Sequence, residues 1–166
     1  PNLLAQLPSQ IDSHHITMTG ELVDCFSDRQ QGVRAIIEAF KQYSAAEIKI
    51  FSRHGLISSQ QADMEPHNVA SMNWLATARA VAEKHAHAVL VDIGSTTTDI
   101  LSIRNHQLQL TACTDFERLV SGALVYTGVV RSCVNTLTEA VVFKSQPVPL
   151  IAENFAVTAD IYRILN

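Results

Sequence analysis

Charged residues are scarce in this sequence, and basic residues are scarcer than acidic ones. Charged residues make up 17% of the 166 residues and hydrophobic residues 47%, a balance that supports a packed core and argues against disorder. The 12 lysines and arginines are scattered along the chain, and with 16 acidic residues the formal net charge is −4. Because no basic face is available, we expect no nucleic-acid partner.

Cysteine and long apolar runs are also lacking. Cys25, Cys113 and Cys133 are widely separated, odd in number and form no C-x-x-C pair. They predict reduced thiols in a cytoplasmic protein rather than a disulfide framework. No apolar run approaches the roughly 20 residues of a membrane helix, and no signal peptide is visible. We therefore expect a cytoplasmic protein with no membrane partner.

Metal-binding and nucleophile signatures are absent as well. The seven histidines show no H-E-x-x-H or similar spacing. His14 and His15 are adjacent, so on a strand they would face opposite ways, while His85 and His87 have no third ligand nearby. The sequence thus predicts neither a structural zinc site nor covalent catalysis by a Cys–His or Ser–His pair.

Strands and helices are expected to alternate up to residue 94. Val33, Ile36, Ile37 and Phe40 recur at the spacing of an amphipathic helix, and Ser27 with Gln30 three residues later forms a capping-box pattern. The periodicity predicts, in chain order, a strand at 16–20, a helix at 27–43, a strand at 47–52, a polar loop at 58–66, a helix at 66–85 and a buried strand at 86–94.

The remainder of the chain begins with consecutive strands. Strands at 96–103 and 108–112 follow the buried one, so residues 88–112 read as an antiparallel meander. The segment 115–139 mixes helical and loop signals. Short strands at 140–143 and 148–151, separated by Pro147, precede a helix at 153–165.

One short stretch, VLVDIGSTTTDILSI at 89–103, concentrates polar chemistry between two strands. Gly94 allows close approach of the backbone to a ligand and can adopt a positive φ. Hydroxyls and backbone N–H groups in such a turn favour phosphate. The predicted phosphate-binding residues are Gly94, Ser95, Thr96, Thr97 and Thr98. In P-loop and dinucleotide-binding folds the glycine turn leads into a helix, whereas β-branched residues follow it here and predict a strand.

Two carboxylates, Asp92 and Asp99, flank this turn. They would repel bare phosphate, and they are explained if a hard cation such as Mg²⁺ sits between them and the phosphate. We therefore assign Asp92 and Asp99 as candidate metal ligands and catalytic residues. The alternative is that serine and threonine simply suit a connecting turn and that Asp99 caps local backbone.

The segment DIGSTTTDI resembles the phosphate loop of the actin, hexokinase and heat-shock-chaperone ATPase superfamily, in the variant of hydantoinase and oxoprolinase-like proteins. The resemblance implies an α/β fold with ribonuclease-H-like mixed sheets and flanking helices. It also implies two such halves, each beginning with a meander whose first loop holds nucleotide phosphates. ATP is therefore a possible ligand alongside Mg²⁺.

Further segments are similar to a narrower family that is linked to tetrahydromethanopterin-dependent one-carbon transfer in methanogens and methylotrophic bacteria. These segments are HITMTGELVDCFSDRQQGV, SMNW, LVYTGVVR and ENFAVTADIYRI. An archaeal member acts in methanofuran assembly, where it joins an aminomethylfuran diphosphate to γ-glutamyltyramine and releases diphosphate. The resemblance implies a transferase with a small-molecule diphosphate substrate.

The chain carries one such phosphate loop where the superfamily has two. It also begins with Pro1 rather than methionine and ends at Asn166, directly after a helical pattern. We expect a fragment of a two-half protein. Residues 1–86 would be the C-terminal part of the first half, and residues 87–166 the start of the second half with its loop.

Other candidates come with a plainer alternative. In related folds an acidic residue after the strand at 16–20 faces the cleft, which makes Glu21, ahead of Asp24, a candidate catalytic residue; both could instead be ordinary loop carboxylates. Weaker candidates are Arg53 and His54 for meeting a negative substrate, Asn73 and Trp74 for a binding role, and Arg118 and Arg131 for contacting diphosphate oxygens. The alternatives are a surface pair that ends a strand for Arg53 and His54, and a core position for Trp74.

Three functions remain open from sequence. The first is the diphosphate-releasing transferase of methanofuran or related cofactor biosynthesis. The second keeps the fold but uses ATP, as a kinase or a hydantoinase-like hydrolase. The third is a non-catalytic phosphate-binding or partner domain. Oligomeric state has no signature in the sequence.

Overall fold

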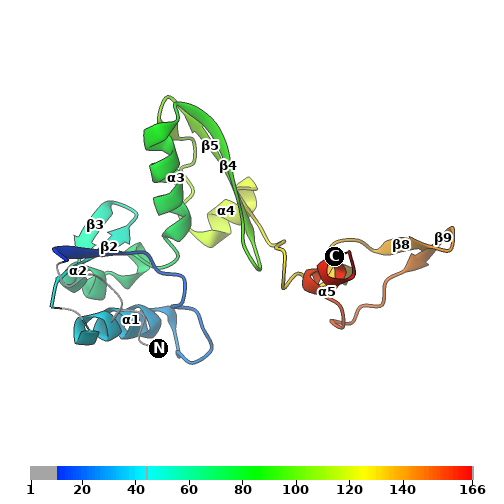
Figure 1. Ribbon diagram of the computed structural model, residues 1–166, viewed down its shortest axis with the longest axis horizontal. Coiled ribbons are helices and arrows are strands. Elements are labelled where there is room, and N and C mark those ends of the chain that lie inside the picture. The colour runs from blue at the N-terminus through cyan, green and yellow to red at the C-terminus, as the bar shows by residue number, and fades with distance from the viewer. Residues whose placement is uncertain (1–10, 44, 166) are drawn as a thin grey trace. The chain divides into compact units, whose positions relative to one another are not determined.

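The structure, a computed structural model, describes residues 11–43 and 45–165 (Figure 1). It is a mixed α/β fold with several small sheets and flanking helices, as predicted. The chain divides into two compact units between Ala80 and Val81, somewhat before the predicted boundary at 86/87. Among the described residues, no helix has both the length and the apolar character needed to cross a bilayer.

The first unit is built on a three-stranded sheet. Strand β1 (Ser13–Ile16) pairs in parallel with β2 (Glu47–Ser52), and helix α1 (Arg29–Tyr43) connects them. Strand β3 (Gly55–Ser58) then returns antiparallel to β2. Parallel neighbours require a long connection, and an α-helix is the usual one.

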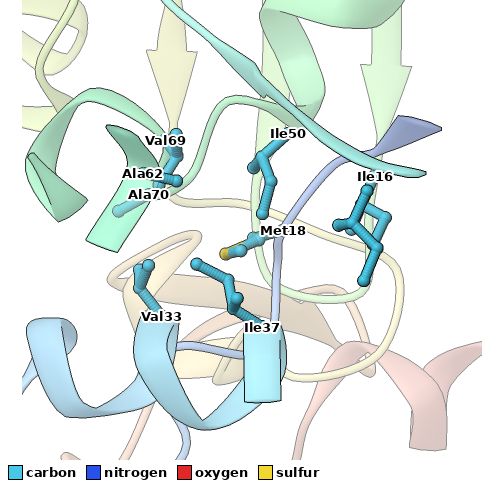
Figure 2. Packing of buried hydrophobic residues seen from close by; sticks show 9 residues of the cluster. Ile16, Met18, Val33, Ile37, Ile50, Ala62, Val69 and Ala70 are labelled. Carbon is cyan, nitrogen blue, oxygen red and sulfur yellow. The ribbon is translucent and has the colours of Figure 1, made fainter. Parts of the chain in front are cut away.

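The core of this unit lies between α1 and the sheet (Figure 2). Val33 and Ile37 come from the predicted apolar stripe of α1, and Ile50 from the buried face of β2; all three are at most 1% exposed. Fully burying an aliphatic side chain of this size contributes about 1.5–3 kcal/mol. The other members of the cluster are Ile16, Met18, Ile48, Ala62, Val69 and Ala70.

The predicted start of α1 was wrong by one position. The helix begins at Arg29, and the backbone N–H of Gln31 donates to Asp28 Oδ1 at 2.8 Å. The side chain of Gln31 accepts from the backbone N–H of Ser27 at 2.6 Å. Asp28 and Gln31 have the same spacing as Ser27 and Gln30, and aspartate caps a helix as well as serine does, so the sequence pattern fitted both registers.

Other boundaries in the first unit also differ from the prediction. The expected strand at 16–20 is β1, which ends at Ile16. The expected polar loop at 58–66 contains helix α2 (Ser59–Met64), started by a capping box between Ser58 and Gln61. The expected helix at 66–85 is split into a 3-10 turn, η2 (Pro66–Asn68), and α3 (Asn73–Lys84).

The second unit begins with the predicted meander. Strands β4 (His87–Ile93), β5 (Thr98–Arg104) and β6 (Gln107–Leu108) pair antiparallel in that order. The β5–β6 turn at residues 105 and 106 has positive φ at both positions. The short strand β7 (Leu124–Val125) pairs with the start of β5.

Strand β4 is not the fully buried strand that its apolar run predicted. Its residues alternate in exposure, with Val89, Val91 and Ile93 at 68%, 51% and 57%. On β5, Leu101 and Ile103 are only 1% exposed. Because residues directly opposite in a hairpin share a face, the described residues of this unit cover one face of β4–β5 and leave the other apolar face open.

The rest of the second unit consists of short elements. Helix α4 (Asp115–Ser121) has a capping box between Thr114 and Glu117. A 3-10 turn, η3 (Val134–Thr136), follows. Strands β8 (Ala140–Phe143) and β9 (Gln146–Pro149) form a hairpin in which Pro147 lies within β9 rather than between the strands. Helix α5 (Thr158–Leu165) starts later than the predicted residue 153.

Candidate phosphate-binding site

The turn at 94–97 connects β4 to β5. The backbone N–H of Gly94 donates to the carbonyl oxygen of Thr97 at 2.8 Å, which closes the turn. The residues of the turn are half-buried or exposed, and a strand follows the turn, as predicted. Gly94 does not have a positive φ. A Cβ atom there would lie 3.2 Å from the carbonyl oxygen of Thr97. The close packing of the backbone within the turn, rather than a left-handed conformation, therefore explains why this position is a glycine.

Some of the polar groups at the turn form hydrogen bonds within the protein, and others do not. Thr98 Oγ1 donates to the carbonyl oxygen of Thr127 at 2.6 Å. By contrast, the backbone N–H groups of Ser95, Thr96 and Thr97 donate to no group among the described residues. The hydroxyls of Ser95 and Thr96 lie 3.4 Å from each other and make no other hydrogen bond in this part of the chain. Successive free N–H groups in a turn are suited to hold an anion.

Asp92 and Asp99 lie directly opposite each other as Cα partners on β4 and β5. Opposite residues of an antiparallel pair share a face, and like charges there are destabilising. Burial raises the pKa of Asp99 above 3.8, the nearby Arg118 guanidinium opposes this shift, and the Asp92 and Asp115 carboxylates add to it. Two facing carboxylates of this kind favour a bound cation.

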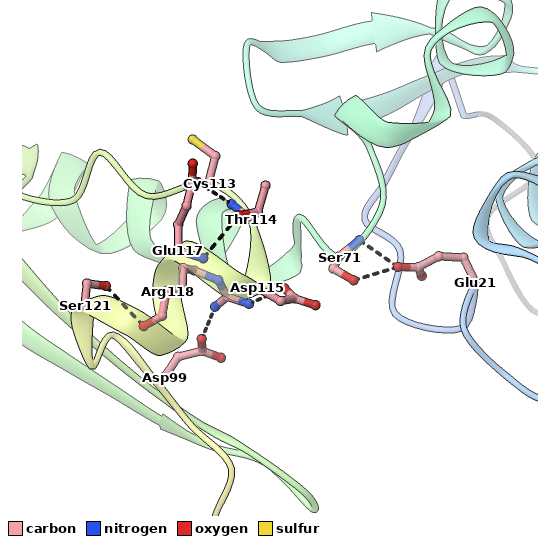
Figure 3. A network of polar contacts seen from close by, with 9 residues as sticks. All are labelled: Glu21, Ser71, Asp99, Cys113, Thr114, Asp115, Glu117, Arg118 and Ser121. Carbon is pink, nitrogen blue, oxygen red and sulfur yellow. Dashed lines mark hydrogen bonds and ion pairs between the residues drawn. The ribbon is translucent and has the colours of Figure 1, made fainter.

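Arg118 is the cation that the fold supplies to Asp99 (Figure 3). It lies on α4, is 4% exposed, and donates to Asp99 and, at 2.9 Å, to Asp115. The Thr114–Glu117 capping box fixes the start of the same helix. Arg118 was a candidate for binding diphosphate oxygens; the structure instead buries it between two carboxylates, so it organises the acidic side of the site.

The residues present fit a magnesium ion that keeps most of its water. No group of three or more His, Cys, Asp or Glu side chains within the described ranges is placed to hold a metal. Asp92 and Asp99 would thus supply the protein ligands, with water and phosphate oxygens completing the shell. Mg²⁺ is usually bound in this way, through one or two carboxylates and a substrate phosphate.

Sequence reasoning missed a second segment, residues 127–131, that lies on the turn. The backbone N–H of Val129 donates to the carbonyl oxygen of Gly94 at 3.1 Å. The N–H groups of Val130 and Arg131 both donate to the carbonyl oxygen of Ser95, at 3.1 and 2.9 Å. The signal was the LVYTGVVR segment, which carried part of the family resemblance, although a binding role was predicted there only for Arg131.

Gly128 is the point of closest approach between this segment and the turn. A Cβ atom at Gly128 would lie 2.5 Å from the backbone nitrogen of Thr96 and 2.6 Å from the carbonyl oxygen of Gly94. Its own N–H donates to Ser132 Oγ at 2.7 Å, and its carbonyl accepts from Thr158 Oγ1 at 3.0 Å. Buried hydrogen bonds to Ser132 and to Thr158, the first residue of α5, therefore anchor the segment that supports the turn.

Glu21 lies in the first unit and is 1% exposed. Its Oε1 accepts from the backbone N–H and the hydroxyl of Ser71, at 2.7 and 2.8 Å (Figure 3). Its Oε2 is buried and has no hydrogen-bond partner among the described residues. Gly32 on α1 has no room for a Cβ against the Glu21 backbone. Glu21 is thus a fixed, buried carboxylate, unlike the exposed Asp24, and its catalytic role stays a prediction.

The remaining candidates in the first unit have different surroundings. The N–H of Arg53 donates to the carbonyl oxygen of Asn68 at 3.0 Å, and the carbonyl of Arg53 accepts from Arg79. His54 is exposed and lines a cavity of about 240 Å³. Trp74 is 3% exposed, which favours the core interpretation. Asn73 is the first residue of α3.

Known proteins similar to this chain support the family that the sequence indicated. Residues 12–166 match the hydantoinase/oxoprolinase family, and the chain belongs to it. It is 36% identical over 167 residues to the (4-{4-[2-(gamma-L-glutamylamino)ethyl]phenoxymethyl}furan-2-yl)methanamine synthase of Methanocaldococcus jannaschii, covering 99% of this chain and 50% of that protein. The synthase of the same name from Methanococcus vannielii is 38% identical over 80 residues, 48% of this chain and 36% of that protein. The chain therefore spans half the length, or less, of these relatives.

Proposed function

We propose that this chain forms part of an enzyme of methanofuran or related one-carbon cofactor biosynthesis, a transferase that releases diphosphate. The observation that carries the proposal is the turn at 94–97, whose N–H groups have no partner among the described residues, together with the facing carboxylates Asp92 and Asp99. The name of the relatives supports the substrate class, because it describes a product in which a furan methylene is joined to a phenol oxygen.

We propose the following bond chemistry for a product of this kind. The phenol oxygen of one small molecule attacks the methylene carbon of a furylmethyl diphosphate and forms a C–O ether bond. The bond between that carbon and the diphosphate oxygen breaks, and the electron pair leaves with diphosphate. The phenol proton must pass to a base. Negative charge therefore gathers on the departing diphosphate, and groups placed to receive it lower the barrier.

In this proposal the residues of the second unit bind and orient the diphosphate. The N–H groups of Ser95, Thr96 and Thr97 and the hydroxyls of Ser95 and Thr96 donate to its oxygens. When bound, Mg²⁺ would supply positive charge to offset the leaving group, and Asp92 and Asp99 would hold it. Arg118 keeps the Asp99 carboxylate in position.

Glu21 is our candidate for the base. Ser71 fixes one of its oxygens, and the other has no partner among the described residues. In this proposal, that second oxygen takes up the phenol proton. The free thiols Cys25, Cys113 and Cys133 fit a reducing compartment such as the cytoplasm.

The test uses the full-length protein that contains this chain. It is mixed with Mg²⁺, the aminomethylfuran diphosphate and the phenolic amine, and released diphosphate is measured together with the ether product. Diphosphate release that requires both substrates supports the proposal. No release by the folded protein rejects it. ATP in place of the furan diphosphate is the second arm: ATP binding and turnover without any response to the furan compound would indicate a kinase or ATP-using hydrolase.

Asp92→Asn and Asp99→Asn distinguish an enzyme from a non-catalytic phosphate-binding domain. If the domain only binds a partner, both variants should keep the biological role, measured as growth on one-carbon substrates. We expect instead that growth and diphosphate release are lost together.

A further inference from the structure

Arg131 lies beside the turn at 94–97, and its side-chain charge has no partner among the described residues. Its backbone N–H donates to the carbonyl oxygen of Ser95 at 2.9 Å. Its side chain is exposed, and no ion pair or hydrogen bond of its guanidinium is found within the described residues. We propose that Arg131 is a binding residue whose guanidinium contacts the diphosphate held by the turn at 94–97. This inference rests on the proposed function and adds a residue to its site.

The backbone holds Arg131 in place from two sides. Val129, Val130 and Arg131 bond through successive N–H groups to the two carbonyls of Gly94 and Ser95. On the other side, Gly128 is tied to Ser132 and Thr158 by buried hydrogen bonds. The segment therefore cannot move away from the turn without losing these bonds. From this anchor point, the long side chain of Arg131 has the reach to meet a ligand at the turn.

The charges around the turn explain why a further cation is needed. Asp92, Asp99 and Asp115 are acidic, and Arg118 offsets one of these three carboxylates. Arg118 is buried between its two partners and is not exposed for a ligand. Apart from the proposed Mg²⁺, these protein groups therefore carry net negative charge, so a further positive side chain beside the turn favours an incoming diphosphate. Among the described residues, Arg131 is the basic residue whose backbone bonds directly to the turn.

Arginine is chemically suited to this role. Its planar guanidinium presents a fork of donors that matches two phosphate oxygens at once. Lysine would supply charge without the fork. Loss of a charge-assisted hydrogen bond in binding typically weakens affinity by roughly tenfold to a hundredfold. We expect an effect of that size at Arg131, on binding of the diphosphate substrate rather than on folding.

The first experiment is calorimetric titration of the full-length protein with inorganic diphosphate in the presence of Mg²⁺. Arg131→Gln should weaken binding about tenfold or more, and its affinity should fall less steeply with added salt. Arg163→Gln, which removes an exposed arginine of α5 in the same unit, is the matched control and should bind within about twofold of the unaltered protein. Arg131→Gln affinity equal to that of the control overturns the inference.

The same titration separates this inference from the proposed function. If the unaltered protein binds no diphosphate, the proposed function and the inference both fail. If it binds diphosphate, and Asp92→Asn weakens binding while Arg131→Gln does not, the proposed function stands and the inference is overturned.

A second measurement needs no substitution and so does not depend on a variant folding. The unaltered protein is treated with the arginine reagent phenylglyoxal, with and without diphosphate and Mg²⁺, and modified peptides are quantified by mass spectrometry. Diphosphate should slow modification of Arg131 several-fold and leave modification of Arg163 unchanged. Equal modification of Arg131 in both conditions overturns the inference.

Discussion

Asp92 and Asp99 face each other across β4 and β5, one residue on each side of the same antiparallel pair. The sheet therefore places two acids side by side at the base of the turn, and Arg118 bonds to only one of them within the described residues. A fold selected for stability alone has no reason to keep Asp92 there, because like charges in this position cost free energy. In the proposed function, a bound cation would offset this repulsion.

Replacing Asp92 with asparagine should improve stability and impair function. Without ligand, the free energy of unfolding should rise by a few tenths of a kcal/mol, since the repulsion with Asp99 is removed. Diphosphate release should fall about a hundredfold or more. Chemical denaturation and the product assay measure the two effects. Asp63→Asn, at an exposed position in the first unit, is the control. A variant less stable and fully active would contradict the role of Asp92.

Removing Arg118 should lower the free energy of unfolding much more than removing an exposed charged residue does. Arg118→Met leaves the Asp99 carboxylate, which is 14% exposed, without its buried partner. Breaking such a pair typically destabilises a protein by about 3–5 kcal/mol. The double variant with Asp99→Asn should recover part of the loss, because no unpaired charge remains. Thermal unfolding of the single and double variants gives the coupling energy. Additive effects would mean that the two residues do not interact.

The pH dependence of stability should carry the signature of Asp99. Burial raises the pKa of Asp99 above 3.8, with Arg118 opposing the shift. The folded state thus binds this proton more readily than the unfolded state does. The resulting contribution to stability is complete below pH 3.8 and is lost as the pH rises through the folded pKa. Between pH 3 and 7 without metal, the free energy of unfolding should fall more with pH in the unaltered protein than in Asp99→Asn. Parallel curves would contradict this assignment.

Gly128→Ala should disturb the backbone of the turn while leaving its polar side chains unaltered. The added Cβ would overlap backbone atoms of Ser95 and Thr96, and overpacking of this kind typically costs about 1–3 kcal/mol. The displaced segment should also weaken diphosphate binding. Gly20→Ala is a matched control, since its Cβ would meet only the Ile36 side chain at the ordinary distance of 3.9 Å. Thermal unfolding and calorimetry should separate the two variants; similar behaviour would count against a close fit at Gly128.

Local patterns in the sequence predicted the turn and the strand after it better than they predicted the segments that support the turn. The β-branched residues after Gly94 indicated a strand, and in the structure the register of the hairpin pairs Asp92 with Asp99. The stripe of Val33 and Ile37 likewise predicted the buried face of α1. These features depend on neighbours in sequence, which periodicity reports directly.

Contacts between distant residues could not be read in the same way. Arg118 follows Asp99 by a loop, a short strand and part of a helix, and nothing local marks the pair. The hydrogen bonds from residues 129–131 to the turn depend on where the chain runs after β7, which the local sequence does not indicate. The short helix α2 was taken for a loop, because its polar sequence SQQADM lacks an apolar stripe. Exposure of one face of β4 depends on which elements cover the sheet, which an apolar run does not specify.

Backbone amide resonances of the turn give the most direct test that it holds a diphosphate. In the full-length protein labelled with ¹⁵N, diphosphate and Mg²⁺ should shift the signals of Ser95, Thr96 and Thr97, whose N–H groups have no partner among the described residues. The signals of Asn105 and His106, in the other turn of the same meander, should stay in place. Unmoved signals for all three turn residues at saturating diphosphate would contradict the phosphate-binding role.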